Sequence, residues 1–588
     1  MRGLRTPALV VGAMVVSLLA LAVIDTASAV AERSRIPPTS LTDQQKAIHL
    51  LNRITYGPRP GDVKRVQVMG LDAFLRQQLH PEGIDDPAVE ERLKPLETIW
   101  MNSGELAPYF PRGGVLRELR KQGLVSTQEE MKNRADTRGE RKAKKGRNPI
   151  FRPLNRLPEA VVPEGRKFRK LGPIKGVNGL GVISQQLQAA KLIRAVYSER
   201  QLQEIMVDFW MNHFNVYMGQ GQDRMMVSTY ERETIRPHCM GKFRNLLGET
   251  ARAPVMLSYL DNKLSISPRS AAGLKASQKG KKARGLNENY ARELMELHTL
   301  GVDGGYTQQD VIEVAKVFTG WTHSGNARAG PVAFEFRANS HDPGDKTVLG
   351  TTIHGIPGKQ GVREGEQVLD MLAKHPSTAR FLAMKLARRF VADDPPRSLV
   401  GKVAQTYLKT DGDIREMLST IFHSKEFWSP QAYRAKAKKP LELIASSVRA
   451  VGAEFTPSPA LLRTMQLMGE PLYHCGPPTG YPDVGAAWIN SGTLLYRWNF
   501  AVALTGGRVP GVRLRGLLDL RGQGTQEILD TLSDRFLGEK LSDNTRTKLH
   551  AMLEHHRAEM TGRRGKAERS EVQYIAGLVL GSPEFQRR

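Results

Sequence analysis

The sequence predicts a mainly α-helical fold, a multi-helix body that carries a small β-hairpin or ribbon near residues 332–353. Apolar residues recur at helical spacing along most of the 588 residues, and strands and helices do not alternate. Two short stretches differ, because residues 333–337 alternate and residues 346–353 are rich in Thr, Val and Ile. We therefore expect helices packed on helices, with one small β element.

The N-terminus has the three-part layout of a secretory signal peptide. Arg2 and Arg5 precede an apolar run over residues 8–24, and small residues follow at 27–29. We expect cleavage after Ala29, and therefore export to the periplasm, the cell surface or the medium. The apolar run is near the lower length limit for a membrane span, so retention as an anchor is the alternative.

The chain carries an unusually large positive charge, +26 at pH 7 with a pI near 10. This charge predicts attraction to polyanions such as nucleic acid, anionic lipid or acidic glycan. Export argues against nucleic acid. An anionic glycan or the envelope surface is then the expected partner.

Two basic loops are the candidates for that contact. Residues 112–175 hold 19 Lys or Arg against 7 Asp or Glu, a net of +12, with five prolines, so we expect a flexible insertion. A second basic loop covers residues 273–285. The candidate binding residues are Lys142, Lys144, Lys145, Arg147, Lys281 and Lys282. For residues 112–175 a solubilising loop is favoured over an arm that docks to a polyanion.

The predicted organisation has five segments. They are a signal peptide (1–29), an N-terminal helical segment (30–111), the basic insertion (112–175), a main helical domain with the β-ribbon at 332–353 (176–505) and a C-terminal helical segment (506–588).

Residues 286–321 predict two helices joined by a glycine turn. Asn287 is the expected N-cap of the first helix and Gly301 its stop. Capping boxes predict two helix starts, one from Thr42 and Gln45 and one from Thr307 and Asp310. The apolar stripe of the first helix is Leu286, Tyr290, Leu294 and Leu297.

The ionisable residues of this first helix fall into two groups. Glu288, Arg292 and Glu296 lie four residues apart, which favours a salt-bridge ladder over catalysis. Glu293 and His298 flank the apolar stripe on its two edges. From those positions a side chain can point into a cleft while its neighbours hold the core.

His213 falls in the middle of another apolar helical face, in residues 205–217. Burying an unpaired imidazole costs on the order of 1–3 kcal/mol, so His213 needs a hydrogen-bond partner. One interpretation is a structural histidine bonded to a backbone carbonyl. The other is a ligand or general base that faces a polar pocket.

These residues suggest chemistry without establishing it. His213, Glu293 and His298 are candidate catalytic residues, and His213, His298, His341 and Asp342 are candidate ligands of a divalent metal. Their spacing in the sequence does not show that they meet, and no other cofactor is indicated. Glycine-rich phosphate loops, HExxH and GxSxG do not occur.

The two cysteines, Cys239 and Cys475, each follow a histidine. A disulfide, a zinc site or two separate thiols are all compatible with the sequence. Two separate thiols are favoured, because the short Cys-x-x-Cys spacing of zinc sites is absent.

Several motifs together resemble one bacterial family. They are residues 287–305 with the following TQQDVIEVAKVFTGW, Phe334-x-Phe336 with His341-Asp342-x-Gly344, PPTGYPD at 477–483, WMNHF at 210–214, residues 375–396, and LNRxTYG at 51–57. Over about residues 41–504 the chain is similar to the family catalogued as domain of unknown function 1800. The basic segment 112–175 departs from the family pattern.

The resemblance implies an exported, mostly helical bacterial protein, often encoded beside a sulfatase-like family that is a candidate partner. It supplies no catalytic residues. Two functions therefore stay open. The favoured one is an envelope-associated accessory or binding protein for an anionic polymer or a protein partner. The alternative is a metal-dependent or His/carboxylate-dependent hydrolase that acts on an envelope or extracellular polymer.

Overall fold

The computed structural model describes residues 40–109, 148–151, 154, 180–219, 221, 223–279, 285–325, 330–514, 520, 523–560 and 567–588. Over these residues the chain is mainly helical and has three two-stranded antiparallel sheets, which confirms the predicted fold class. The expected signal peptide and most of the basic insertion lie outside this part of the chain. The candidate binding residues Lys142, Lys144, Lys145, Arg147, Lys281 and Lys282 also lie outside it.

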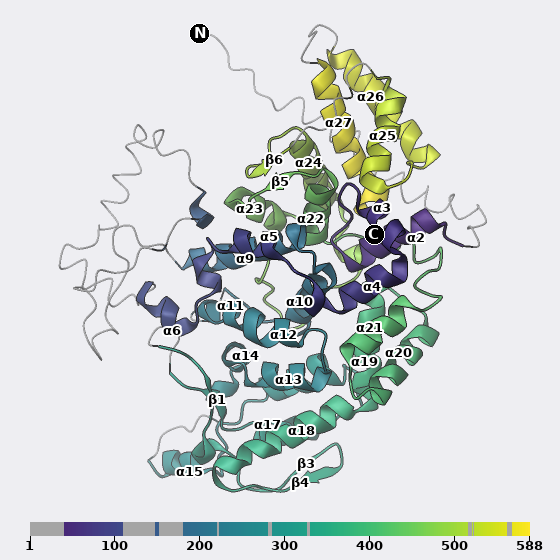
Figure 1. Cartoon of the computed structure of the whole chain (residues 1–588). Helices are drawn as coiled ribbons and strands as arrows, with labels where there is room; N and C mark the ends of the chain where they lie inside the picture. The colour runs from purple at the N-terminus through teal and green to yellow at the C-terminus, as the bar shows by residue number, and fades with distance from the viewer. Residues whose placement is uncertain are drawn as a thin grey trace, which may run out of the picture.

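The first described helices are α2 (Asp43–Ile54), α3 (Asp62–Met69), α4 (Leu71–Leu79), α5 (Pro87–Leu93) and α6 (Ser103–Leu106). They run across the molecule in Figure 1, from α2 and α4 on the right to α6 on the left. The predicted capping box begins α2, because Thr42 Oγ1 accepts from the backbone N of Gln45 at 3.2 Å and Gln45 Oε1 accepts from Thr42 N at 3.1 Å. The apolar faces of α2 and α4 both pack on α10 (Gln201–His213).

Helices α9 (Gly181–Tyr197) and α10 run through the middle of the molecule (Figure 1). Nearly every residue of α10 is buried, because α2, α4 and α9 pack around it. Shorter helices follow: α11 (Val227–Thr229), a π-helical stretch (Tyr230–Ile235), α12 (Arg236–His238), α13 (Phe243–Arg252), α14 (Pro254–Tyr259) and α15 (Ala271–Gln278). This central position means that residues at the end of α10 are held rigidly.

The predicted helix at residue 286 begins later than expected. Helix α16 covers Asn289–Glu293 and continues as a π-helical stretch, Leu294–Thr299. Asn287 does not act as the N-cap of α16, since Glu288 holds that position, although Asn287 Oδ1 accepts from Asn289 N at 2.9 Å. Gly301 ends the element with a φ of 84°, as predicted.

Two further predictions about this region have definite outcomes. Of the expected ladder, the pair Arg292–Glu288 forms at 3.2 Å, whereas Glu296 accepts a hydrogen bond from the hydroxyl of Tyr306. The capping box of Thr307 is confirmed at the start of α17 (Gln308–Val317).

Strands β2 (Phe334–Phe336), β3 (Lys346–Val348) and β4 (Thr351–Ile353) lie where the sequence places them, but β2 pairs with a strand that was not predicted, β1 (Trp321–His323). Strand β3 pairs with β4. The physical reason is the turn between β3 and β4. Leu349 and Gly350 both have positive φ, 48° and 76°, so the chain folds back on itself there as a tight hairpin.

The C-terminal half adds two helical groups. Helices α18 (Val362–Lys374), α19 (Pro376–Phe390), α20 (Arg397–Lys409) and α21 (Ile414–Phe422) pack in succession beside α13. The other group comprises α22 (Pro440–Ala450), β5 (Glu454–Phe455), α23 (Pro459–Leu467), α24 (Ser491–Thr505), β6 (Val512–Arg513), α25 (Thr525–Leu537), α26 (Asp543–Met560), α27 (Ala567–Gly581) and α28 (Pro583–Gln586).

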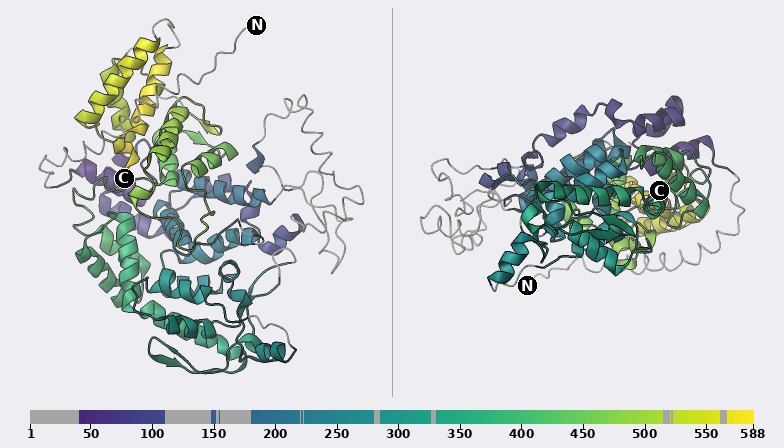
Figure 2. Two further views of the ribbon diagram at one scale, coloured as in Figure 1. Left: turned by 180° about the vertical axis from the view of Figure 1, so that it is seen from behind. Right: turned by 90° about the horizontal axis from the view of Figure 1, so that it is seen from below.

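The chain returns to the centre at its C-terminus. Figure 2 shows that the last residues leave the projecting group α25–α27 and end beside α2. Arg588 is buried there, and its backbone N and O both bond Lys436, at 3.2 Å or less. The buried apolar residues form one cluster from Ala47 to Phe585. A single cluster does not test the predicted segment boundaries, which stay predictions.

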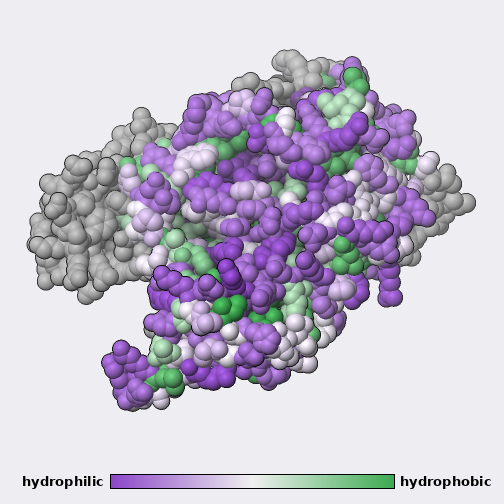
Figure 3. All heavy atoms as spheres, turned by 60° about the horizontal axis from the view of Figure 1, so that its bottom comes forward, coloured by the Kyte–Doolittle hydropathy of each residue, from purple (hydrophilic) through white to green (hydrophobic). Residues whose placement is uncertain are grey.

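The described surface is mainly hydrophilic. Exposed large apolar side chains are scattered, with Val68 and Val302 the most exposed at 81% and 69%. Figure 3 shows apolar residues in small separate areas on one face. No helix in the described ranges is both long and apolar enough to cross a bilayer.

Candidate functional site

His213 is the last residue of α10 and is almost completely buried. Its ring lies edge-on to Trp210 and faces Phe209, with centroids 5.2 and 6.3 Å away. Its Nε2 lies 3.0 Å from the backbone O of His298, and its Nδ1 has no hydrogen-bond partner. The expectation of a backbone carbonyl partner is confirmed, and one ring nitrogen remains for a ligand.

His213 and the neighbouring His298 are both neutral at physiological pH. Burial lowers the pKa of His213 well below its usual range, and the positive charge of Lys385 lowers it further. The same two causes lower the pKa of His298 to about 3. The two rings are neighbours, with centroids 6.3 Å apart. A neutral imidazole that donates from Nε2 presents a lone pair at Nδ1.

Glu293 is half-buried on α16. Burial raises its pKa, the negative charge of Glu296 adds to the rise, and Arg292 opposes it. The negative charge of Glu293 also contributes to the raised pKa of Tyr259. No hydrogen bond joins Glu293 to His213 or His298 in the described structure, so the catalytic roles of these three residues stay predictions.

His341 and Asp342 belong to a different cluster. His341 Nε2 lies 3.1 Å from Glu364 Oε1, and Nδ1 lies 2.9 Å from the backbone O of Thr319. Asp342 accepts from Arg269 Nη2 at 2.6 Å and from a serine hydroxyl. Burial raises the pKa of Asp342, but these hydrogen bonds outweigh it and the pKa is lowered.

The predicted metal site is therefore not formed by His213, His298, His341 and Asp342. The first two lie together at the end of α10, whereas the last two are engaged with Glu364 and Arg269. Among the residues that the structure describes, no group of three or more His, Cys, Asp or Glu could hold a metal ion. The prediction failed because linear spacing does not show which side chains meet.

The two cysteines are separate thiols. Cys239 and Cys475 are both buried and free, so the disulfide and the shared zinc site are wrong. Burial raises the pKa of Cys239 to about 12, which makes it an inert core side chain.

A cavity of about 170 Å³ lies beside His213. Four cationic side chains line it, Lys385, Arg388, Arg389 and Lys439, against one carboxylate, Asp483. The remaining wall is formed by Phe209, Asn212, Thr479, Tyr481 and Pro482. We call this cavity the basic pocket.

The cations of the basic pocket are only partly neutralised. Arg389 Nη1 donates to Glu442, but Arg389 Nε and Nη2 are buried without a partner. Lys385 and Arg388 form no ion pair with any described residue. Arg388 Nε donates to a backbone O at 2.9 Å, and the Lys385 ammonium lies 5.3 Å from the ring centroid of Phe381.

Lys385 registers this environment in its pKa. Burial is the largest cause, Asp483 opposes it and Arg388 adds to it, and together they lower the pKa of Lys385 to about 8. An ammonium that is partly desolvated and lacks a counter-ion is held at a cost in free energy. A bound anion would remove that cost.

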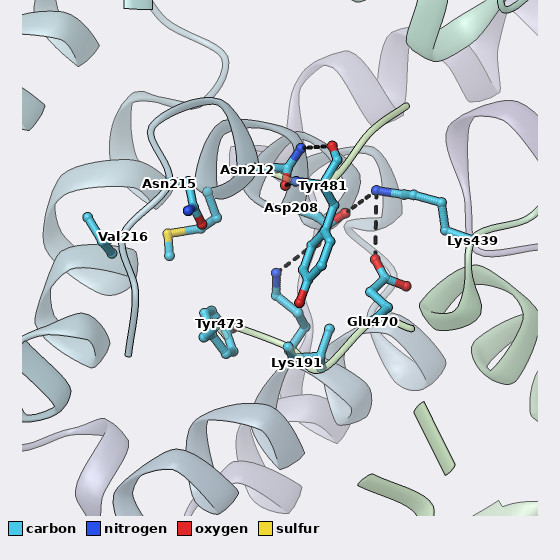
Figure 4. A pocket seen from close by; sticks show the side chains of 11 residues that line it. Lys191, Asp208, Asn212, Asn215, Val216, Lys439, Glu470, Tyr473 and Tyr481 are labelled. Carbon is cyan, nitrogen blue, oxygen red and sulfur yellow. Dashed lines mark hydrogen bonds and ion pairs between the residues drawn. The ribbon is translucent and has the colours of Figure 1, made fainter. Parts of the chain in front are cut away.

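A second, smaller chamber shares Asn212, Lys439 and Tyr481 with the basic pocket. Figure 4 shows Asp208 between two lysines, with Glu470 beyond Lys439. Asp208 accepts from Lys191 at 2.7 Å and from Lys439 at 3.3 Å. Lys439 Nζ lies 4.0 Å from Glu470 Oε1.

The acids of this small chamber have opposite pKa shifts. The two lysines outweigh burial at Asp208 and hold its pKa far below its usual range. Burial dominates at Glu470 and raises its pKa to about 7. Asp208 is therefore a fixed negative charge, whereas Glu470 titrates near neutrality.

The loop 476–483 closes one side of both cavities. Asn212 holds it, since Asn212 Nδ2 donates to the backbone O of Tyr481 at 2.8 Å and Asn212 Oδ1 accepts from its N at 2.7 Å. Gly480 has a φ of 71°, and a Cβ there would lie 2.3 Å from the backbone O of Asn212. Only glycine fits this close approach.

The comparisons with known proteins place the whole described site inside one family. Residues 49–587 match the family described as protein of unknown function (DUF1800). The chain belongs to the DUF1800 family. No curated protein and no solved structure matches it. The family match extends through the C-terminal helices α25–α28, beyond the residues 41–504 over which the motifs indicated the resemblance.

Sequence reasoning missed the cations of the basic pocket. Lys385, Arg388 and Arg389 lie within the family motif at residues 375–396, but no role was predicted for them. The available signal was their spacing at i, i+3 and i+4, which places three cations on one face of an otherwise apolar helix. The loop 477–483 is the family motif PPTGYPD, but its contact with Asn212 was not predicted.

Proposed function

We propose that this DUF1800 protein binds an anionic ligand in the basic pocket beside His213, as an exported binding or accessory protein of the cell envelope. The observation that carries the proposal is the unneutralised charge of that pocket. Lys385 and Arg388 lack ion pairs in the described structure, and two N–H groups of Arg389 are buried without an acceptor. Each buried unpaired donor costs about 1–3 kcal/mol, which an anion would recover.

Export and an anionic polymer as the partner rest on the sequence. The N-terminal layout of residues 1–29 supports export, and the basic segment 112–175 supports attraction to a polyanion. Under this proposal the basic segments collect the polymer and the pocket binds one of its charged groups. The mature protein should begin at Val30, which N-terminal sequencing of the exported protein would test.

Ligand binding is tested with two buried arginines that differ in place. Arg389 lines the basic pocket, whereas Arg53 is fully buried outside the pocket wall, within charge range of Arg389, and has two unpartnered nitrogens of its own. Inorganic phosphate, sulfate and a carboxylate series are titrated by calorimetry against wild type, Arg389→Met and Arg53→Met. We expect an anion to bind wild type and Arg53→Met, and Arg389→Met to bind it roughly 10-fold or more weakly.

Wild-type measurements alone can overturn the proposal. A ligand at 100 times its Kd stabilises the folded state by about 2.7 kcal/mol, so a bound anion should raise the unfolding temperature. The affinity for the anion should also fall as the salt concentration rises, because chloride competes for the pocket and salt screens the attraction between charges. If no anion binds wild type, or if Arg53→Met loses as much affinity as Arg389→Met, the pocket is not the site.

The alternative of a hydrolase has one observation in its favour. His213 lines the pocket and its Nδ1 is free to accept a proton. Its lowered pKa makes it a weak base, however, and a poor match to catalysis near neutral pH. Release of soluble fragments from an acidic envelope polymer by wild type, but not by His213→Phe, would favour the hydrolase over the binding protein.

A further inference from the structure

The basic pocket offers more than positive charge, because one of its lining residues, His213, has a ring nitrogen without a hydrogen-bond partner. A backbone carbonyl can only accept, so the contact with His298 O assigns the ring proton of His213 to Nε2. The ring stays neutral because its pKa is lowered by burial. Its Nδ1 is then an unprotonated, buried acceptor without a donor. An anion oxygen cannot satisfy it, whereas a hydroxyl group can.

The size and walls of the pocket restrict the body of the ligand. A dry cavity of about 150 Å³ in another protein holds a benzene ring, so a cavity of about 170 Å³ admits one six-membered ring with substituents. Phe209, Tyr481 and Pro482 supply apolar and aromatic wall. Such walls with a few polar groups are typical of sites for ring-shaped ligands.

The charged and polar groups of this cavity come from different elements. Lys385, Arg388 and Arg389 lie on α19, whereas His213 ends α10 and Tyr481 lies in the loop 476–483. A ligand that contacts both the cations and His213 needs an acid group and a hydroxyl group.

We infer that the basic pocket binds one hydroxylated, ring-sized acid, a sugar acid of the uronate class, with its carboxylate at the α19 cations and a hydroxyl group donating to His213 Nδ1. This inference rests on the proposed function and names its ligand. The same unit can be a free sugar acid or the end of an acidic polysaccharide. Both present the same chemistry to the pocket.

Three small ligands separate the contributions. D-glucuronate has the acid, the ring and the hydroxyl groups. Cyclohexanecarboxylate lacks the hydroxyl groups, and D-glucose lacks the acid. We expect D-glucuronate to bind wild type roughly 10-fold more tightly than cyclohexanecarboxylate, since only the former satisfies Nδ1. D-glucose should bind more weakly than either acid.

Two histidines provide a matched pair of variants. His49 is buried like His213, has Nε2 2.8 Å from the backbone O of Phe427, leaves Nδ1 unpartnered and does not line the pocket. His213→Phe should bring the affinity for D-glucuronate down to that for cyclohexanecarboxylate, with the latter unchanged. His49→Phe should alter neither. The ligand comparison on wild type needs no variant, so it decides the question even if His213→Phe does not fold.

The possible failures are distinct. If neither acid binds wild type, the proposed function fails. If both acids bind with equal affinity, the anion pocket stands and the sugar-acid inference is wrong. If D-glucuronate binds more tightly than cyclohexanecarboxylate, an oligoglucuronide distinguishes the two sources of the ligand. Equal affinity per end for monomer and oligomer indicates a polymer end, whereas binding of the monomer alone indicates a free sugar acid.

Discussion

Replacing Lys385 by methionine should change stability and ligand affinity in opposite directions. Burial lowers the pKa of Lys385 to about 8 from an ordinary 10.5. That difference corresponds to at most about 3 kcal/mol of unfavourable free energy for the charged form in the folded state at pH 7. Lys385→Met removes this charge and keeps most of the side-chain volume, so the free protein should become more stable.

The sign of the pH dependence follows from the lowered pKa. Between pH 8 and 10.5 the unfolded chain binds more protons at Lys385 than the folded chain does. The contribution of Lys385 to the stability of wild type therefore rises with pH across that window. The advantage of Lys385→Met should be full below pH 8 and vanish above 10.5. Among the other charges at the pocket, the pKa values of Arg389 and Lys439 are raised and that of Asp483 is lowered, so these three groups do not change ionisation in this range.

Ligand affinity should show the reverse. The anion needs the ammonium form, of which roughly 3% remains at pH 9.5 for a pKa of about 8. Affinity of wild type should thus fall by up to roughly 30-fold between pH 7 and 9.5. Lys385→Met should bind the anion weakly at both pH values, with little pH dependence.

Urea unfolding and calorimetry at pH 7 and 9.5 measure both effects, and Lys438→Met is the control. Lys438 is also buried, lies 3.8 Å over the ring of Phe585 and has a lowered pKa, but it does not line the pocket. It should gain stability without losing affinity. The reasoning is refuted if Lys385→Met binds the anion as wild type does, or if it is less stable than wild type at pH 7.

Three other predictions concern the surroundings of the pocket. Glu470→Gln should be more stable than wild type above pH 7 and equal to it near pH 4.5, because a raised pKa means that stability falls as pH rises through about 7; urea titrations at both pH values test this. Arg588→Met should unfold at lower temperature and bind anions more weakly, because Arg588 Nε holds Glu442 at 3.1 Å; retention of wild-type affinity would contradict it. Gly480→Ala should cost more than about 1 kcal/mol, since its Cβ would meet Asn212 O at 2.3 Å; an unchanged unfolding temperature would show that the loop moves freely.

Local features of this fold were predictable from the sequence. The capping boxes of Thr42 and Thr307 and the stop at Gly301 act within a few residues, so their signals are contained in the sequence pattern. The start of α16 shifted because Glu288 rather than Asn287 takes the N-cap. The strand pairing was missed because the turn at residues 349–350 decides it. Leu349-Gly350 is not a standard hairpin signal.

The candidate site was predictable only in part. His213 was identified because an imidazole on an apolar helix face needs a partner, and the partner is a carbonyl as expected. The metal set failed because His341 found Glu364 instead. The basic pocket brings together Asn212, Arg389 and Tyr481, which lie up to 269 positions apart. Contacts at that separation leave no periodic signal in one sequence.

The burial of Arg588 has a consequence for the ligand pocket. Its guanidinium bonds Glu442 and the backbone O of Arg389, so a residue that follows the projecting group α25–α27 braces an arginine of the pocket. The chain must therefore return from that group before the pocket takes its final form. A substitution that unfolds α25–α27 would release this brace and disturb the pocket from a distance, although the lining residues of the pocket come from other elements.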